Sequence, residues 1–248
     1  MTASQHRRLL VLAPHPDDAA LSVGGFLVRL REPVVLFTIF GRSNYTSRGF
    51  HAHWQTVSAI RKTEDAAFAA SIGATLRYPA LPEAAIRIGP SERLIFAKAG
   101  GRVADYPRLD AVLEATIASM RPRAVLVPAA LGGHVDHILV RRVVSRILRT
   151  RDVPIAYYED LPYATRIGAW QLVESILSFD ARLKPLTVDI TDQLTGKLRR
   201  LGLYKSQLGP AERSAVRRHS KRWGPGAVER LWSQWPVTAI LDGVRLSF

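Results

Sequence analysis

The sequence predicts an α/β protein with a mainly parallel sheet and helices on both of its faces. Apolar runs of strand length alternate with longer segments of helical period, which is the pattern of βα units. Two short polar motifs, Pro14–Asp18 and His134–His137, each follow such an apolar run. Because α/β proteins bind ligands at the carboxyl ends of parallel strands, we expect both motifs at one functional edge.

The elements up to Tyr158 follow from these patterns in chain order. Strands are expected at Leu9–Ala13, Val34–Phe40, Leu76–Tyr78, Ala124–Val127 and Ile155–Tyr158. Helices are expected at Leu21–Leu30, Trp54–Ser71, Pro107–Met120 and Asp136–Arg149. Polar sequence with glycines and prolines predicts loops at 41–53 and 79–106, the second with a helical turn near Ser91–Ala97.

The C-terminal third has weaker patterns. Leu172–Leu177 is compatible with a helix or a strand, Leu186–Asp189 is extended, and helices follow at Thr191–Gln207 and Pro210–Arg218. Val237–Leu246 is expected to form a short closing strand pair that turns at Asp242-Gly243. Without a visible repeat or linker, residues 1–248 are expected to form a single domain.

Composition limits the chemistry. The chain has no cysteine, so any metal must be bound by imidazole and carboxylate groups. Its formal charge of +14 favours anionic partners and suggests an anionic or polyhydroxylated substrate. The densest basic stretch, Lys197–Arg222, is expected to be the solvated face of C-terminal helices. No apolar run approaches the roughly 20 residues of a membrane span, so a cytoplasmic protein is expected.

The two polar motifs together contain the ligands for a metal ion. A hydrolytic site needs about three protein ligands and an open position for water, and two imidazoles with one carboxylate form a common zinc set. His15 and Asp18 can supply two ligands from one loop, and His137 is the candidate for the third. A metal bound in this way lowers the pKa of its water to roughly 7.

The remaining polar residues of the motifs have roles available to them in hydrolysis. Asp17 lies beside a ligand and can accept a proton from water as general base. His134 can stabilise an oxyanion or protonate a leaving nitrogen. Asp136 can hold the far N–H of an imidazole and fix its tautomer.

These motifs resemble those of a known family. Ala-Pro-His-Pro-Asp-Asp after the first strand, Gly24-Gly25 beyond it, and the later His-x-Asp-His are similar to the zinc-dependent GlcNAc-PI de-N-acetylase family, also called PIG-L or LmbE-like. The resemblance implies a Rossmann-like fold and removal of an acetyl group from the nitrogen of an amino sugar. By motif, the implied roles are zinc binding for His15, Asp18 and His137, general-base catalysis for Asp17, and electrostatic or acid catalysis for His134 with Asp136 as its partner.

Substrate contacts are expected from loops at the same edge. Arg42 and Asn44 follow the second strand, and Glu83 is a candidate for contacting sugar hydroxyls. Arg61 opens a segment similar to the family's R-x-x-E helix, whose arginine faces the substrate.

The chain also departs from the family pattern. Ala19 and Phe40 stand where family members often have Glu and Asp, and Gly132 stands where some members have Tyr. These departures leave the metal ligands intact but put the usual sugar contacts in doubt.

Two other functions fit the same residues. A metal phosphoesterase would use the acidic and histidine-rich site with Mg²⁺ or Mn²⁺, and would hold two ions and release phosphate. A nucleic-acid or polyanion binder would use Lys197–Arg222 and retain the site as a relic. We expect instead a deacetylase acting on a small N-acetylated molecule, with Zn²⁺ as cofactor; an oligomer is compatible with the sequence.

Overall fold

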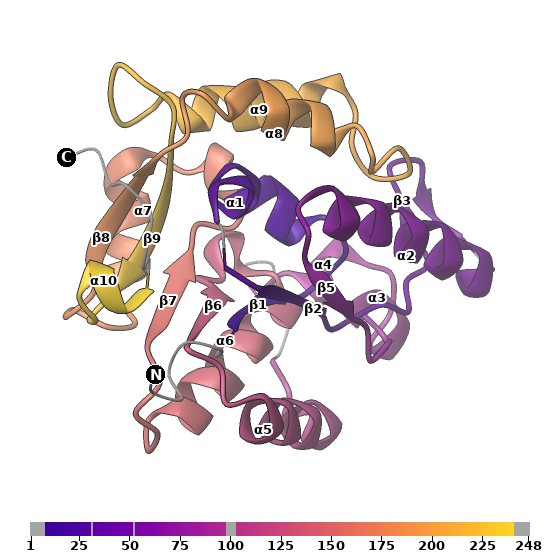
Figure 1. The fold of residues 1–248 in the computed structure, drawn as a ribbon. Coiled ribbons are helices and arrows are strands. Elements are labelled where there is room, and N and C mark those ends of the chain that lie inside the picture. Colours follow the sequence, from indigo (N-terminus) through magenta and orange to yellow (C-terminus); the bar gives the residue numbers. More distant parts are fainter. Residues whose placement is uncertain (1–7, 31, 52, 98–102, 241–248) are drawn as a thin grey trace.

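The computed structural model describes residues 8–30, 32–51, 53–97 and 103–240, and its centre is a seven-stranded sheet (Figure 1). The strands lie in the order β5-β2-β1-β6-β7-β9-β8. In that order their bounds are Thr75–Arg77, Val34–Thr38, Leu9–Ala13, Ala124–Pro128, Ile155–Tyr158, Val228–Ser233 and Lys184–Asp189. The first five are parallel, whereas β9 is antiparallel to both β7 and β8.

Helices cover both faces of this sheet. α1 (Asp18–Arg29) and α2 (Trp54–Ser71) lie on one face, and α5 (Pro107–Met120) and α6 (Val135–Leu148) lie on the other (Figure 1). α8 (Leu194–Leu201) and α9 (Pro210–Ser220) add a layer outside α1. The smaller elements are β3 (Tyr45–Thr46), β4 (Gly49–Phe50), α3 (Ala84–Arg87), α4 (Glu92–Ile95), η3 (Leu131–Gly133), η4 (Tyr163–Arg166), α7 (Ala169–Leu177) and α10 (Val237–Ile240). The predicted fold class is therefore confirmed.

The central strands are almost entirely apolar because both faces are covered. Every residue of β1, β2 and β6 is buried. Each large aliphatic side chain buried in this way stabilises the fold by about 1.5–3 kcal/mol. The same burial explains why these strands are visible in the sequence as uninterrupted apolar runs.

The strand order creates the crevice in which the two motifs meet. From β1 the chain proceeds through β2 to β5 on one side, then returns to β6 and continues to β7 on the other. Connections therefore leave the adjacent ends of β1 and β6 in opposite directions, which opens a crevice at their carboxyl ends. Pro14–Asp18 follows β1 and His134–His137 follows β6, so topology brings the motifs together.

The closing antiparallel pair is present but is formed by β8 and β9. The expected strand at Val237 is wrong, because Val237–Ile240 is helical, and the expected turn at Asp242-Gly243 lies outside the described residues. β9 was hidden in the sequence because Glu229 and Arg230 interrupt its apolar pattern, although both are buried. Glu229 accepts hydrogen bonds from the backbone N–H groups of Gly25 and Phe26, at 2.8 and 2.7 Å.

The basic stretch is only partly a solvated face. Arg217 and Arg218 are exposed on α9, as expected. Lys197 is instead buried, with its Nζ 2.7 Å from Glu229 Oε1, so this lysine is part of the core. Among the described residues, no helix combines the length and the apolar character that crossing a membrane requires.

Candidate metal and catalytic site

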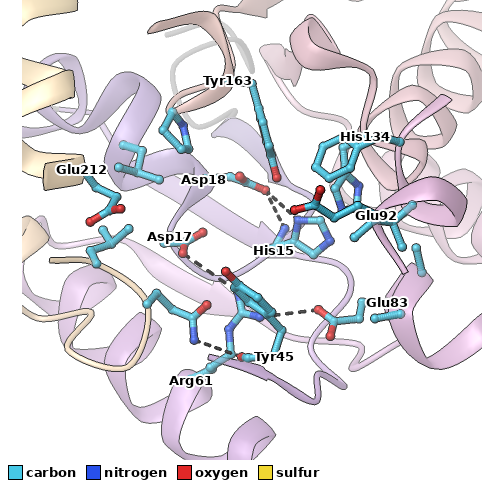
Figure 2. Close-up of a pocket in the computed structure, with 18 of the residues that line it drawn as sticks. His15, Asp17, Asp18, Tyr45, Arg61, Glu83, Glu92, His134, Tyr163 and Glu212 are labelled. Carbon is cyan, nitrogen blue, oxygen red and sulfur yellow. Dashed lines mark hydrogen bonds and ion pairs between the residues drawn. The ribbon is translucent and has the colours of Figure 1, made fainter. Parts of the chain in front are cut away.

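The loop after β1 presents two neighbouring carboxylates to different parts of the site. Asp18 Oδ2 accepts a hydrogen bond from the backbone N–H of His15 at 2.8 Å, which holds this carboxylate beside the His15 ring. Asp17 has a φ of 97°, a strained conformation for a residue other than glycine. Asp17 therefore faces the pocket, whereas Asp18 faces the histidines (Figure 2). α1 begins at Asp18, three residues before the predicted start.

The loop after β6 brings in the second pair of histidines. His134 caps α6, because its Nδ1 accepts a hydrogen bond from the backbone N–H of Asp136 at 3.2 Å. His137 follows in the first turn of the helix and is fully buried. The cap fixes the start of α6 and therefore the direction of the His137 side chain.

His15, Asp18 and His137 form a triangle of potential metal ligands. His15 Nδ1, Asp18 Oδ2 and His137 Nε2 lie 3.3 Å from one another along each edge. Ligands on a tetrahedral ion at roughly 2.0–2.1 Å lie about 3.3–3.4 Å apart. The three donor atoms therefore have the spacing of three corners of a tetrahedral zinc site, and the fourth corner is left for solvent or substrate.

A carboxylate orients each histidine of this triangle. Asp136 Oδ2 lies 3.0 Å from His15 Nε2, and Asp160 Oδ1 lies 2.6 Å from His137 Nδ1. Asp136 is itself held by Arg87, whose Nη2 lies 2.8 Å from its Oδ1. Carboxylates that accept the far N–H of an imidazole leave the other nitrogen free to bind a metal.

One predicted pairing is wrong. The Asp136 carboxylate contacts His15 rather than His134, which receives only the backbone N–H of Asp136. Asp160 was not predicted to belong to the site. Its sequence signal was its place directly after the Ile155–Tyr158 strand, which is adjacent to β6 in the sheet.

Both histidines of the triangle bind protons tightly. Burial lowers the pKa of His15, but its contacts with Asp136 and Asp18 outweigh burial and raise the pKa to about 9. Burial also lowers the pKa of His137, but Asp18 and Asp160 outweigh burial and raise this pKa to about 10. The pKa of each histidine in the unfolded chain is 6.5, so protonation of His15 and His137 stabilises the metal-free fold. This stabilisation is complete below about pH 6.5 and is lost as pH rises through 9–10.

We therefore expect the zinc affinity of the metal-free protein to rise at least about tenfold per pH unit between pH 6 and 8. The reason is that the ion binds deprotonated imidazole and must displace the protons on His15 and His137. Calorimetric titration with Zn²⁺ in two buffers of different ionisation enthalpy measures the protons released. Zinc binding with no proton release would contradict this expectation.

Asp17 lies outside the triangle and lines the pocket. Burial raises the pKa of Asp17 to about 8, although the Arg61 guanidinium, with Nη2 3.9 Å from Asp17 Oδ2, acts in the opposite direction. Arg61 also donates to Pro16 O at 3.1 Å and Ser43 Oγ at 2.6 Å, which braces the loop. A carboxylate with a pKa near neutrality is suited to accepting and returning a proton.

His134 is suited to donating a hydrogen bond in its neutral form. Burial, together with the positive charge of His15, lowers the pKa of His134 well below 6.5. Because its Nδ1 accepts the Asp136 N–H, the proton of the neutral ring is on Nε2. His134 lines the pocket, so this N–H is available to a substrate oxygen.

The pocket above the triangle has a volume of about 260 Å³ and includes only some of the predicted substrate contacts. Glu83 and Arg61 line it, 3.4 Å apart, with Ser43 Oγ donating to Glu83 at 2.8 Å. Arg42 and Asn44 are not among its lining residues. The Arg42 guanidinium lies over the Trp54 ring, and the Asn44 N–H donates to Glu83 at 3.1 Å.

Tyr163 was not predicted and forms one wall of the site. Its ring packs against His134 and His137, with centroids 6.1 and 5.4 Å apart, and its hydroxyl points toward Asp18 (Figure 2). Gly132 makes room for it, since a Cβ on Gly132 would lie 2.5 Å from Tyr163 Cβ. No local pattern indicated this contact, because it joins the segment after β7 to the loop after β6.

Comparisons with known proteins identify the family of this chain. The sequence profile of the GlcNAc-PI de-N-acetylase family, PIG-L, matches residues 10–148. The 2'-N-acetylparomamine deacetylase of Streptomyces fradiae is 32% identical over 226 residues, which cover 88% of this chain and 80% of that protein.

Two solved structures share the fold. The A40926 pseudoaglycone deacetylase has a TM-score of 0.69 at 24% identity, over 92% of this chain and 97% of that one. A zinc-inhibited form of teicoplanin deacetylase has a TM-score of 0.69 at 22% identity, over 91% and 97% of the two chains. Taken with the profile and the Streptomyces relative, the chain belongs to the GlcNAc-PI de-N-acetylase (PIG-L) family.

Proposed function

We propose that this protein is a zinc-dependent N-deacetylase that removes the acetyl group from an N-acetylated amino sugar. The observation that carries the proposal is the 3.3 Å triangle of His15, Asp18 and His137 at the base of a pocket that Asp17 and His134 also line. Family membership and the activity of the Streptomyces relative support the same reaction.

The residues of the triangle fit a zinc ion. Two imidazoles and one carboxylate, all buried, are a common zinc set, and Asp136 and Asp160 hold the two imidazoles. Zinc bound there supplies Lewis acidity, which polarises the acetamide carbonyl and makes water more acidic.

Asp17 is the proposed general base. Its carboxylate accepts a proton from the attacking water and returns this proton to the departing nitrogen, which leaves as the amine while the acetyl group leaves as acetate. Asp17 can do this because it faces the pocket and is not a member of the ligand triangle.

His134 is the proposed oxyanion donor. Its Nε2–H donates to the acetamide oxygen as negative charge develops there, and its neutral state keeps the residue a hydrogen-bond donor rather than an acid. Tyr163 approaches the same region, and its O–H provides a second donor beside the His134 N–H.

Tyr163→Phe is therefore expected to lower kcat roughly 10–100-fold with little change in KM, because a donor to the oxyanion acts mainly in the transition state. The variant keeps the ring that packs on His134 and His137, so the fold should be preserved. Steady-state kinetics of acetate release measures the effect. An unchanged kcat would remove Tyr163 from the mechanism.

Metal analysis and an acetate-release assay on N-acetylated amino sugars test the proposed function. The metal-free protein is reloaded with Zn²⁺, Co²⁺ or Mn²⁺, and zinc is also titrated to excess because a zinc-inhibited relative has this fold. Acetate release with about one ion per chain supports deacetylation. Phosphate release with two ions per chain would support a phosphoesterase instead.

The geometry also disfavours a second ion. His15, His134 and Asp136 form another group of potential ligands. The Asp136 carboxylate is, however, already engaged by Arg87 and His15, and His134 Nδ1 is engaged as a helix cap. These groups are therefore not free to bind a second metal.

A further inference from the structure

The mouth of the pocket is acidic, although the chain as a whole carries a formal charge of +14. Glu92 and Glu212 lie on opposite sides of the pocket, with the catalytic groups between them (Figure 2). Among the described residues that line the pocket, Arg166 is the only Lys or Arg apart from Arg61, which is buried against Asp17 and Glu83. The local charge is thus opposite in sign to the net charge.

Neither mouth carboxylate has a basic partner among the described residues. Within the part of the chain that the structure describes, no side-chain nitrogen of Lys, Arg or His lies within 4.0 Å of a carboxylate oxygen of Glu92 or Glu212. Glu212 Oε2 accepts the backbone N–H of Gly209 at 2.8 Å, which fixes the side chain. The deeper carboxylates differ, since Asp18, Asp136 and Glu83 all pair with basic side chains.

Two exposed aromatic rings line the same pocket. Tyr45 and Phe50 belong to the β3–β4 hairpin, remain 41% and 38% exposed, and contact each other with ring centroids 5.2 Å apart. Gln207 anchors the hairpin by donating to Tyr45 O at 3.2 Å. Exposed aromatic faces in a pocket wall attract both apolar ring faces and ammonium groups.

The size of the pocket divides the substrate between an inner and an outer part. A volume of about 260 Å³ is below the roughly 300–1,000 Å³ typical of sites that enclose a whole drug-sized ligand. The inner part therefore holds the N-acetylated ring above the triangle, and any further ring lies at the mouth, beside the aromatic hairpin and the two carboxylates.

We propose that the substrate is an N-acetylated amino sugar with a second ring that carries free, protonated amines, which Glu92 and Glu212 bind while Tyr45 and Phe50 contact the ring. This inference rests on the proposed function and names its substrate class. It keeps the polyhydroxylated alternative of the sequence-based expectation and reverses the anionic one. The reason is that charges at the mouth lie closer to the substrate than the distant basic surface, which salt screens.

Two substrates of similar size test the inference. One is 2'-N-acetylparomamine, which has free amines on its second ring, and the other is the neutral N,N'-diacetylchitobiose. Glu92→Gln and Glu212→Gln should each raise KM for the first roughly 3–10-fold and leave KM for the second within about twofold. Glutamine keeps an oxygen for the Gly209 N–H, so the fold is preserved. Arg166→Gln is the matched control and should lower KM for the cationic sugar.

Equal effects of the glutamate variants on both substrates, or no effect on either, would overturn the inference. If the parent protein releases acetate from neither sugar, the proposed function fails. Calorimetric binding of paromamine to the parent and the two variants then decides the inference separately. Binding that the variants weaken supports it, and absent or unchanged binding overturns it.

Discussion

Replacing Asp17 by asparagine is expected to lower kcat by about 10²–10⁴-fold while KM changes little. Asparagine has the same shape but cannot accept a proton from water at neutral pH. The proposed metal ligands His15, Asp18 and His137 are untouched, so the variant should retain zinc as the parent does. Steady-state acetate release, together with metal analysis of the same sample, measures both properties.

The thermal stability of the Asp17→Asn protein shows whether a loss of kcat is catalytic or comes from a damaged fold. The pKa of Asp17 is about 8 in the folded protein and 3.8 in the unfolded chain. The protonated carboxyl group therefore stabilises the fold at low pH, and this stabilisation is lost as pH rises from about 4 to 8. Asparagine does not ionise, and the metal-free Asp17→Asn protein should be at least as stable as the parent at pH 8. Thermal unfolding at pH 5 and pH 8 tests this.

Asp65 provides a matched control as another buried carboxylate. It accepts hydrogen bonds from Thr38 Oγ1 at 2.6 Å and Tyr204 Oη at 2.8 Å, and it does not line the pocket. Asp65→Asn should therefore weaken the fold but leave kcat of the folded fraction nearly unchanged. If Asp17→Asn retained the parent kcat, the general base would have to be another group.

Sequence patterns predicted the parts of the fold that depend on local apolar character. The runs at Leu9–Ala13 and Ala124–Val127 are strands because helices cover both faces of the sheet, and this leaves a continuous apolar signal. β9 gave no such signal. Its Glu229 is tolerated in the core only because Lys197 and the backbone of α1 pair with it, and those contacts are far away in the sequence.

The site likewise has a part that was predictable from local sequence and a part that depends on distant contacts. Its metal triangle was predictable because both motifs follow strands that a parallel sheet aligns at one edge. Asp160 and Tyr163 were missed because their roles depend on contacts with another loop. Arg42 and Asn44 were placed at the correct edge but away from the pocket, because the backbone of residues 42–44 hydrogen-bonds to residues 81 and 83 and turns their side chains elsewhere.

Replacing His15 by alanine is expected to abolish zinc retention and to lower kcat by at least about 10³-fold, because two remaining protein ligands cannot hold the ion or keep its acidity. His15 is the ligand of choice for this test. Its removal leaves Asp136 still paired with Arg87 and with the Ala84 N–H at 2.8 Å, so no buried charge is stranded. Among the described residues, removing His137 would instead leave the Asp160 carboxylate with only the Leu131 N–H as a hydrogen-bond donor.

Asp160→Asn is a milder change to compare with His15→Ala, since it keeps an acceptor for the His137 Nδ1–H but loses the negative charge. Orienting carboxylates of this kind typically contribute 10–100-fold in metal affinity, so excess zinc should restore Asp160→Asn toward the parent kcat and should not restore His15→Ala. A ligand and its orienting partner are thereby distinguished by one titration of activity against zinc concentration. Parent-like activity in His15→Ala, or in the parent after its metal is removed by chelation, would show that the triangle is not the catalytic centre.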